Sequence, residues 1–500
     1  MFYNFAHPKN GVYYAKLHQF VNTTNIFAQK MIKDELALQI SNQFKFPPTA
    51  DQQHAINTVA EFLTDRNPHA VMILRGSAGT GKTYLSGRIV QLMKRINHKV
   101  CLLAPTGRAA KVFALSSSYT ASTIHRVIYR QKQFTGDMSG FVLDKNLHHN
   151  TLFIIDESSM IANEGMSASA FGEGRLLDDL IQYVYGSSTG CRLLLTGDAA
   201  QLPPVGEFES PALSADVISS YGLKVYESTL NEVLRQSAES GILFNATVIR
   251  SMIGSYIDSA PAIRLNGFAD ISIITGNELI DSLSRSYSEV GVDETIVVTR
   301  SNKRANIYNM GIRRTILDNE EQLSYGDMLM VVRNNYYWPE HLKSELSFIA
   351  NGDRAMVRRV RRTRELYGFT FADVTLRFPD YDDCEMEITA VLDTLASETP
   401  SLSREQNDKL FHAVMEDYID IPNKRERMEK IKNDPYFNAV QIKFAYAVTC
   451  HKAQGGQWEH VYVDQGYMAP EMYDDDYIRW LYTAFTRSSS KLFLVNYPNK

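Results

Sequence analysis

The segment at residues 76–83 has the residue types and spacing of a phosphate-binding loop. It reads Gly-Ser-Ala-Gly-Thr-Gly-Lys-Thr, fits GxxxxGK[ST], and lies between an apolar run at 70–74 and a helical pattern at 82–95. Glycines let backbone N–H groups wrap phosphate oxygens, and the helix start adds positive potential. The Lys82 amine can neutralise β- and γ-phosphate oxygens, and the Thr83 hydroxyl can ligate Mg²⁺. The alternative is a glycine turn that only caps a helix. The residues expected to hold ATP here are Gly76, Ser77, Ala78, Gly79, Thr80, Gly81, Lys82 and Thr83.

Two carboxylates follow an apolar strand at 152–155. Asp156 is expected to hold Mg²⁺ together with Thr83, and Glu157 to position or deprotonate the attacking water. Acidic residues also end strands simply because loops are solvated. The phosphate loop upstream favours the catalytic interpretation, since each motif supplies what the other needs.

The elements around these residues alternate between strand and helix from Pro47 onward. Such alternation predicts a parallel sheet. The runs at 152–156 and 193–198 both end in aspartate, which places their carboxylates at the C-terminal edge of the sheet, where ligands bind in this architecture.

A second group of apolar runs predicts a second α/β lobe. Between its early and late strands we expect an inserted, partly β domain with alternating segments such as 369–378 and a polar helical stretch at 403–432. The second-lobe strands are expected at 295–299, 444–449, 461–463 and 492–495.

The whole chain has the composition of a soluble globular protein. Its 500 residues exceed one hydrophobic core, and 44% hydrophobic with 22% charged residues show no disorder signature. A net charge of −5 argues against a histone-like nucleic-acid binder but allows a basic groove. The four cysteines form no cluster, so neither zinc nor a disulfide is expected. No stretch predicts a membrane span or an export signal, and we expect a cytoplasmic location.

Beyond the nucleotide motifs, ordered blocks resemble those of the superfamily 1 helicases of the RecD and Dda type. The block at 49–52 resembles the adenine-reading glutamine motif and implies that role for Gln52, although Pro48 replaces a leucine that is frequent there. The blocks at 195–206 and 230–236 imply that Gln201 senses the γ-phosphate and that Arg235 reaches it. The block at 482–487 implies that Arg487 is an arginine finger.

Three further blocks resemble motifs that touch single-stranded DNA in this family. They lie at 104–111, 122–126 and 449–455. The alternative for each histidine in them is an ordinary polar residue. The alternative for Arg235 and Arg487 is a solvated ion pair. The DNA-contacting residues implied are Pro105, Thr106, His125, Thr449, His451, Lys452 and Gln454.

The need for Arg235 and Arg487 has a physical reason. A phosphoryl-transfer transition state spreads negative charge that Lys82 and Mg²⁺ do not fully cover, and an arginine finger can be worth ~10³ to 10⁵ in rate. If the two arginines complete the site only when lobes close, hydrolysis becomes coupled to lobe motion.

The resemblance implies an α/β fold of two tandem RecA-like phosphate-loop lobes, with a small hairpin insertion in the first and an SH3-like β insertion in the second. The hairpin is expected at about 127–150, where Gly136 and Gly140 are turn signals. We expect an N-terminal extension of unknown role at 1–46, the first lobe at 47–230, the second lobe at 231–321 and 439–500, and the insertion at 322–438.

Two surfaces of the insertion have open interpretations. The aromatic run at 336–339 could be a base platform or a buried cluster. The arginine-rich run at 358–364, taken to alternate as a strand, could follow phosphates or be a solvated strand face.

The functional hypothesis is an ATP-dependent helicase that moves 5′ to 3′ on single-stranded DNA and unwinds DNA forks, in repair, recombination or replication. The polarity comes from the resemblance alone. The alternative is an ATP-driven translocase that displaces proteins or remodels RNA. A DNA-stimulated ATPase acting as a binding module would lack a catalytic residue, and a small-molecule kinase would not need the blocks around Gln201 and Thr449.

Overall fold

The computed structural model describes residues 26–131, 141–163, 175–187, 190–232, 240–344, 346 and 348–498. The chain divides into two compact units, one formed by residues 1–105 and 109–237 and the other by 106–108 and 238–500. This division falls after Ser237, a few residues beyond the expected end of the first lobe at 230.

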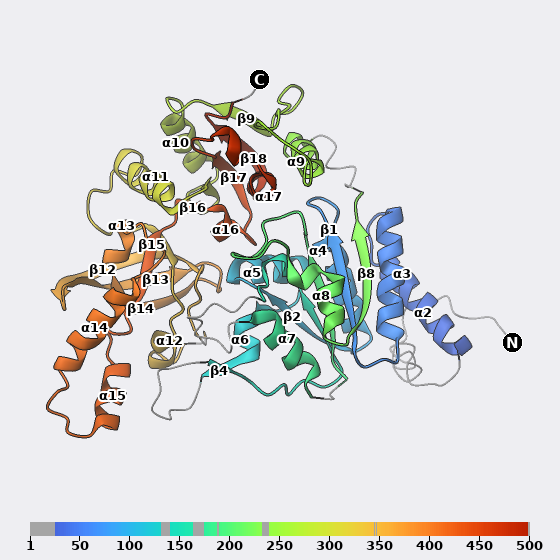
Figure 1. Cartoon of the computed structure of the whole chain (residues 1–500), viewed down its shortest axis with the longest axis horizontal. Coiled ribbons are helices and arrows are strands. Elements are labelled where there is room, and N and C mark those ends of the chain that lie inside the picture. The colour runs from blue at the N-terminus through green and yellow to red at the C-terminus, as the bar shows by residue number, and fades with distance from the viewer. Residues whose placement is uncertain are drawn as a thin grey trace. The chain divides into compact units, whose positions relative to one another are not determined.

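Unit 1 is built on a six-stranded, wholly parallel sheet (Figure 1). Its central strand at Thr151–Ile155 is buried along its whole length, and the neighbouring strand at Arg192–Gly197 is buried except at Arg192, as expected for a sheet covered on both faces. Because all strands run the same way, their C-terminal ends share one edge. In spatial order the strands are β3 (Ala121–Thr123), β2 (Lys99–Ala104), β6 (Thr151–Ile155), β7 (Arg192–Gly197), β1 (Ala70–Gly76) and β8 (Lys224–Leu230).

Helices flank this sheet and supply one large core. Side chains of α2, α3 and α4, among them Ile40, Phe62 and Ile89, pack against β1 and β2. Two short antiparallel strands, β4 (Tyr129–Gln131) and β5 (Phe141–Leu143), lie where the hairpin is expected. The helices are α2 (Ile26–Ser41), α3 (Ala50–Thr64), α4 (Lys82–Arg95), α5 (Gly107–Ser117), α6 (Ile124–Ile128), α7 (Leu176–Tyr185) and α8 (Ala215–Ser220), with 3₁₀ turns η1 (Ser158–Met160) and η2 (Pro211–Leu213).

Unit 2 contains a second parallel sheet, of five strands. In spatial order they are β16 (Ala447–Thr449), β10 (Thr295–Thr299), β17 (Trp458–Asp464), β18 (Ser488–Val495) and β9 (Ile271–Ile274). Its helices are α9 (Gly241–Ser251), α10 (Leu279–Glu289), α11 (Asn302–Thr315), α16 (Cys450–Ala453) and α17 (Asp475–Phe485). Together the two parallel sheets give the chain a RecA-like α/β fold.

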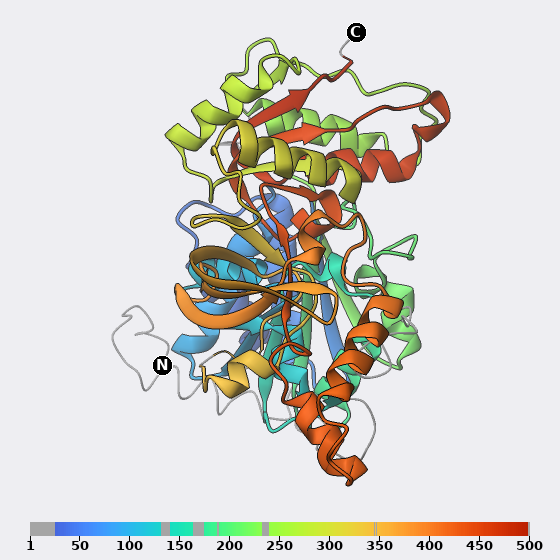
Figure 2. The same cartoon turned by 90° about the vertical axis from the view of Figure 1, so that its left-hand side faces the viewer.

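Unit 2 also contains a closed five-stranded barrel, beside which α14 and α15 form a helical arm (Figure 2). The arm packs Leu410, Val414 and Ile431 against Phe369 and Phe371 of the barrel. The barrel strands are β11 (Met328–Val331), β12 (Arg354–Leu366), β13 (Phe369–Phe378), β14 (Cys384–Val391) and β15 (Val440–Phe444), and its helices are α12 (Tyr337–His341), α13 (Asp393–Ala396), α14 (Arg404–Glu416) and α15 (Lys424–Lys432).

Three features differ from the sequence expectation. The single strand expected at 444–449 is wrong, because the chain passes there from the barrel to the sheet: Ala445 N donates to Met328 O in the barrel, and Tyr446 O accepts from Val297 N in the sheet. The fifth barrel strand also lies beyond the expected end of the insertion at 438. The helical stretch at 403–432 is two helices, since Pro422 cannot continue a helix and Asn423 caps α15.

All four cysteines are free thiols. Among the described helices, none is both long and apolar enough to span a bilayer.

Candidate nucleotide and nucleic-acid sites

The phosphate loop connects β1 to α4 at the C-terminal edge of the unit 1 sheet. Gly79 and Gly81 have φ values of 77° and 87°, which side-chain-bearing residues rarely adopt. A Cβ on Gly76 would lie 2.7 Å from Thr80 Oγ1, which is too close. Residues with a side chain would therefore not fit at these glycine positions without strain or a clash.

The side chains of Lys82 and Thr83 are each held by a hydrogen bond. Lys82 Nζ donates to Ser77 O at 3.0 Å, so the ammonium lies across the loop. Thr83 Oγ1 donates to Asp156 Oδ2 at 3.1 Å. The structure thus brings Lys82, Thr83 and Asp156 together, although 73 residues separate the last two.

Asp156 follows β6 and is almost fully buried, with 6% of its surface exposed. Burial raises the pKa of its carboxyl group, opposed by the N–H of Glu157, by Lys82 and by the hydroxyls of Thr83 and Thr196. A buried carboxylate beside a hydroxyl is a set of hard oxygen donors, the kind that Mg²⁺ prefers, so these residues fit that ion. Thr196, which donates to Asp156 Oδ1 at 3.3 Å, was not found from the sequence because the contact crosses two strands.

Glu157 has φ 54° and ψ 38°, a left-handed conformation that is uncommon for a non-glycine residue. Such outliers persist where the surroundings enforce them. Here the following turn η1 is held by Ser210, whose Oγ donates to Ser159 O at 2.8 Å. The turn that follows Glu157 is therefore bonded to the loop that carries Gln201.

Gln201 lies on the loop after β7 and is 5% exposed. In the part of the chain that the structure describes, its buried side-chain oxygen has no hydrogen-bond partner. A buried unsatisfied acceptor costs about 1 to 3 kcal/mol, and native structures retain few of them. This orphaned oxygen fits a site in which the water that attacks the nucleotide supplies the missing donor.

Gln52 is engaged at both ends of its amide. Its Oε1 accepts from the Thr49 N–H at 3.1 Å, as part of a capping box at the start of α3, and its Nε2 donates to Thr80 O at 3.0 Å. Gln52 therefore ties α3 to the phosphate loop. Both the oxygen and the nitrogen of the amide thus have a partner within unit 1.

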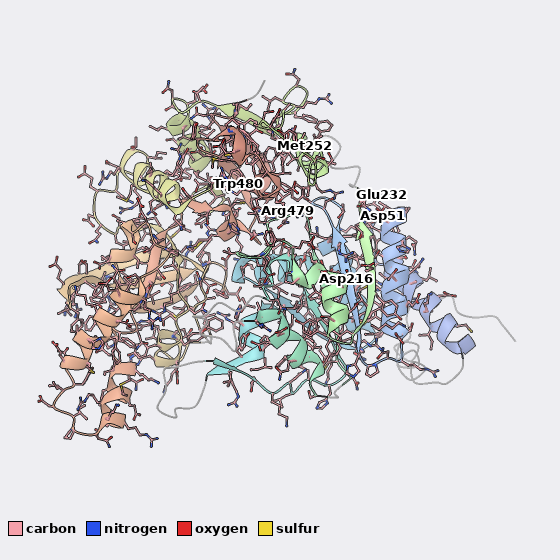
Figure 3. The ribbon with its side chains drawn as sticks, in the orientation of Figure 1. Asp51, Asp216, Glu232, Met252, Arg479 and Trp480 are labelled. Atoms are coloured by element: carbon pink, nitrogen blue, oxygen red, sulfur yellow. The ribbon has the colours of Figure 1, made fainter. Side chains whose placement is uncertain are left out.

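Asp51 is a positioning residue that the sequence did not reveal. Its Oδ2 accepts from the N–H groups of Asn231 and Glu232, at 2.7 and 3.1 Å, directly after β8 (Figure 3). It fixes the start of the segment that leads to Arg235. Arg235 itself lies outside the described residues.

The first group of expected DNA-contacting residues follows two neighbouring strands of the same sheet, β2 and the edge strand β3. Pro105 and Thr106 come after β2, and His125 opens α6 after β3. Burial lowers the pKa of His125 to about 4, so its imidazole is neutral at physiological pH. Its ring lies 5.7 Å from that of Tyr129.

In unit 2, Thr449 ends β16 and begins α16, which carries His451 and Lys452, and the buried Gln454 ends that helix. Burial lowers the pKa of Lys452 to about 8. The amine is therefore close to its titration range at physiological pH.

Arg487 follows α17 and is 2% exposed. Its guanidinium donates to Thr483 O, Gly456 O and Thr486 Oγ1 at 3.0 to 3.1 Å. The structure thus links the Arg487 block to Gly456, the residue directly after the Thr449 block. All three nitrogens are engaged inside unit 2, so action as a finger would require these bonds to exchange.

The aromatic run at 336–339 packs inward. Trp338 is 8% exposed and donates from Nε1 to Asn438 O at 2.9 Å. The ring of Tyr336 lies 4.9 Å from that of Phe348. This favours the buried cluster over the base platform.

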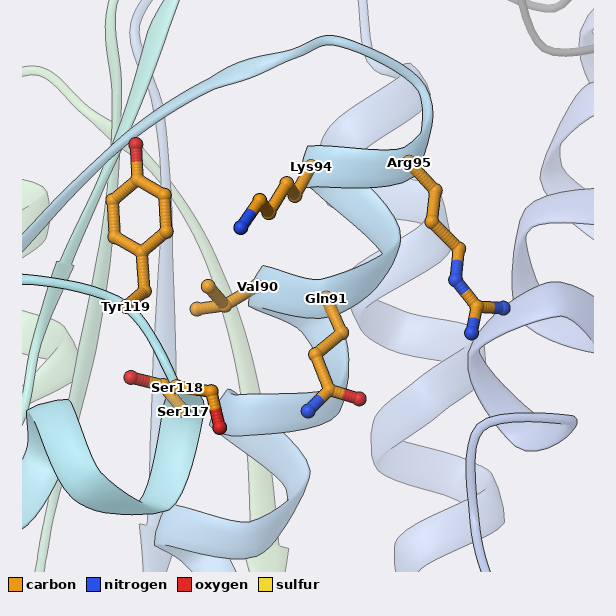
Figure 4. A pocket seen from close by; sticks show the side chains of 7 residues that line it. All are labelled: Val90, Gln91, Lys94, Arg95, Ser117, Ser118 and Tyr119. Atoms are coloured by element: carbon orange, nitrogen blue, oxygen red, sulfur yellow. The ribbon is translucent and has the colours of Figure 1, made fainter. Parts of the chain in front are cut away.

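A hollow of about 290 Å³ lies at the other end of α4 from the phosphate loop (Figure 4). Lys94 points towards Tyr119 across it, with Nζ 5.8 Å from the ring centre. None of its lining residues is an expected site residue, so it is separate from the nucleotide site. The lining residues are Val90, Gln91, Lys94, Arg95, Ser117, Ser118 and Tyr119.

Comparisons with known families match both units. The family described as an AAA domain matches residues 48–250, and the family described as a UvrD-like helicase C-terminal domain matches residues 444–495. The first match contains the phosphate loop, Asp156 and Gln201, and the second contains Thr449 and Arg487.

Individual relatives agree with these matches. An uncharacterized protein of Acanthamoeba polyphaga mimivirus is 25% identical over 88% of this chain and 98% of its own length. The ATP-dependent RecD2 DNA helicase of Deinococcus radiodurans is 33% identical over 27% of this chain and 16% of its own length. The ATP-dependent DNA helicase dda of Enterobacteria phage T4 is 24% identical over 57% of this chain and 60% of its own length. The chain thus spans less than two thirds of either of these two helicases.

Among solved structures, Bacteroides Pif1 bound to single-stranded DNA aligns over 90% of this chain and 92% of its own, with a TM-score of 0.45 and 16% identity. With the two family matches, the related helicases and the nucleotide-site geometry in view, the chain belongs to the superfamily 1 DNA helicases of the RecD and Dda type, which are ATP-dependent enzymes.

Proposed function

We propose that this chain hydrolyses ATP with Mg²⁺ to move 5′ to 3′ along single-stranded DNA and to unwind DNA forks. The observation that carries the proposal is the placement of Lys82, Thr83 and Asp156 at one sheet edge, with Thr83 Oγ1 and Asp156 Oδ2 3.1 Å apart. An ammonium beside a hydroxyl and a carboxylate is what a metal-bound triphosphate requires.

Each residue of the site has a defined task in this proposal. Lys82 neutralises phosphate oxygens, and the N–H groups of 76–83 orient them. Thr83 and Asp156 would hold Mg²⁺, which supplies charge compensation when bound. Glu157, fixed in its left-handed conformation, accepts a proton from the attacking water or orients it.

Coupling to the strand is assigned to Gln201, Arg235 and Arg487. The orphaned oxygen of Gln201 gains its partner only when the site is filled. Arg235 and Arg487 supply positive charge in the transition state. Because Arg487 donates to Gly456 O, its engagement with the nucleotide would break the bond to the residue that follows the Thr449 block.

Strand binding in this proposal is assigned to the blocks that resemble the family's DNA-contacting motifs. DNA as the nucleic acid is supported by the RecD2 and dda relatives, which are DNA helicases. Forks as the substrate remain part of the proposal. The polarity follows from the family resemblance. The contacts are assigned to Pro105, Thr106, His125, Thr449, His451, Lys452 and Gln454.

The closed barrel of unit 2 is assigned as the SH3-like insertion, and the pair β4–β5 as a strand-separating hairpin. The five strands of the closed barrel support the first assignment. The antiparallel pairing of β4 with β5 supports the second. The loop between β4 and β5 lies outside the described residues.

Substitution of Lys82 tests the nucleotide site. Lys82→Ala removes the charge that faces the phosphates, so ATP hydrolysis is expected to fall by at least ~10²-fold, while affinity for single-stranded DNA is largely kept. The steady-state ATPase rate with and without single-stranded DNA, together with strand affinity, measures this.

The matched control is Arg95→Ala. Arg95 is an exposed cation in the last turn of the same helix, about 20 Å from Lys82 by helix geometry. It should leave the ATPase rate unchanged. Normal ATP hydrolysis by Lys82→Ala would contradict the assignment of the nucleotide site to this loop.

A further inference from the structure

Strand β12 contains a sequence whose period does not suit a strand. Residues 357–362 read Val-Arg-Arg-Val-Arg-Arg, a period of three, whereas side chains alternate between strand faces with a period of two. A regular strand would turn one arginine of each pair into the barrel. The simple alternation expected for this run is therefore wrong.

Two bulges resolve this conflict. The register between β12 and β13 skips a residue between Val357 and Arg359 and again between Val360 and Arg362. In a bulge, two residues of one strand oppose a single residue of its partner. Val357 and Val360 consequently face buried side chains of β13, and both arginines of each pair reach the outer face.

The outer face has more arginines than carboxylates to pair with them. Among the described residues, no carboxylate lies within salt-bridge distance of Arg359 or Arg362, and both side chains are exposed. Their neighbours are already neutralised. The ion pairs on this face are Arg358–Glu385, Arg361–Glu387 and Arg364–Asp373.

We propose that Arg359 and Arg362 form a phosphate-backbone contact site for nucleic acid on the outer face of the barrel. Two strand positions separate them, about 6.6 Å by strand geometry, so both guanidinium groups can contact neighbouring phosphates of one backbone. Arginine presents a planar fork of donors that matches phosphate oxygens and keeps its charge at any physiological pH.

The ion pairs of Arg358 and Arg361 determine where on this face unpaired positive charge remains. Glu385 and Glu387 cancel the charge of Arg358 and Arg361, which leaves positive charge concentrated at Arg359 and Arg362. An acidic chain with a net charge of −5 repels nucleic acid in general, so contacts need a local cation pair of this kind. This site goes beyond the proposed motor function and does not require ATP.

The test is the salt dependence of binding without nucleotide. Kobs for single-stranded and for duplex DNA is measured between about 50 and about 200 mM salt, for the native chain and for the double variant Arg359→Ala/Arg362→Ala. The slope of log Kobs against log[salt] is negative. Each lost phosphate contact reduces its magnitude by about 0.7 on single strands and by about 0.9 on duplex. A loss of about 1.4 or about 1.8 is therefore expected, which is about 25- to 60-fold in affinity at 0.1 M salt.

The matched control, Arg358→Ala/Arg361→Ala, removes the same charge from the ion-paired positions. It should leave the slope nearly unchanged, and thermal unfolding verifies that both variants fold. A selective slope loss on single strands or on duplex supports the site and identifies its ligand. Equal losses of slope in both variants would mean a general charge effect. An unchanged slope in Arg359→Ala/Arg362→Ala would mean that these arginines do not contact phosphate. Either result overturns the proposal. Because hydrolysis is not measured, failure here is distinct from failure of the motor function.

Discussion

The side chain of Gln52 joins two elements by both ends of its amide, to the Thr49 N–H and to Thr80 O. Gln52→Ala should therefore loosen the phosphate loop for any nucleoside triphosphate. We expect KM for ATP and for GTP to rise by the same factor, about 5- to 30-fold for one or two hydrogen bonds. Steady-state kinetics with both nucleotides measure this.

Gln53→Ala is the control for Gln52, since Gln53 lies on the same helix and its amide donates to Asn57 rather than to the loop. It should change neither KM. If Gln52→Ala raised KM for ATP alone, the glutamine would be a reader of adenine in the working enzyme and would have to release its present partners.

Lys452 makes strand binding dependent on pH. Burial lowers the pKa of its amine to about 8, and a phosphate contact needs the charged form, so DNA raises that pKa. Affinity is then complete below pH 7 and falls as pH rises through 8, by at most about tenfold per unit for one proton. Titrations of single-stranded DNA from pH 7 to 9 at constant salt measure the fall.

Lys452→Arg keeps the charge throughout this range and should remove most of the pH dependence. The pKa of Lys443 is also lowered to about 8, by burial and by the charge of Lys452. An unchanged fall in Lys452→Arg would assign the titration to Lys443 or another group.

Site residues that lie close together in the sequence could be predicted from their spacing. Contacts between residues that are distant in the sequence could not. Lys82 and Thr83 follow from one octapeptide, and the structure places Asp156 beside them. The tie from Asp51 to the segment after β8 spans 180 residues, so no local pattern reports it. The inward hydrogen bonds of Arg487 depend on how α16 and α17 pack, which its motif does not encode.

At the scale of elements, hydrophobic periodicity predicted those whose pattern is simple. The structure has a helix at Lys82–Arg95, a strand at Thr295–Thr299 and a strand at Phe369–Phe378, each with the expected bounds. Periodicity failed where the chain changes sheets at Ala445 and where bulges alter the period of β12. Both depend on partner strands that are distant in sequence.

A buried ion pair joins the barrel to the parallel sheet of unit 2. Arg313 of α11 donates to both carboxylate oxygens of Asp327 at 2.9 Å, and Tyr446 donates to the same group at 2.8 Å. Both charged side chains are nearly inaccessible, at 2% and 0%. The pair fixes where β11 begins relative to the helix.

Arg313→Met should destabilise unit 2 by about 3 to 5 kcal/mol, because it leaves the carboxylate of Asp327 buried without its partner. Chemical denaturation measures the loss. Arg314→Met, at the exposed neighbouring position, should change the free energy of unfolding by less than about 0.5 kcal/mol. Similar values for the two variants would show that the pair contributes little to stability.

At the scale of the whole molecule, two parallel sheets and a barrel organise one chain for nucleotide and strand binding. The sequence patterns predicted an α/β fold with parallel sheets, which the structure has. The order of strands within each sheet came only from the structure, since crossovers leave no mark in local periodicity. The proposed motor function depends on hydrolysis in unit 1 being coupled to residues such as Arg487 in unit 2.

Unwinding of tailed duplexes, with the ATPase rate followed in parallel, tests that coupling most directly. We predict that single-stranded DNA stimulates hydrolysis and that duplexes with a 5′ tail, but not those with a 3′ tail, are separated. Stimulation without separation of either duplex would favour a translocase. Absence of stimulation by any nucleic acid would contradict the account, because the nucleotide site would then work uncoupled from a strand.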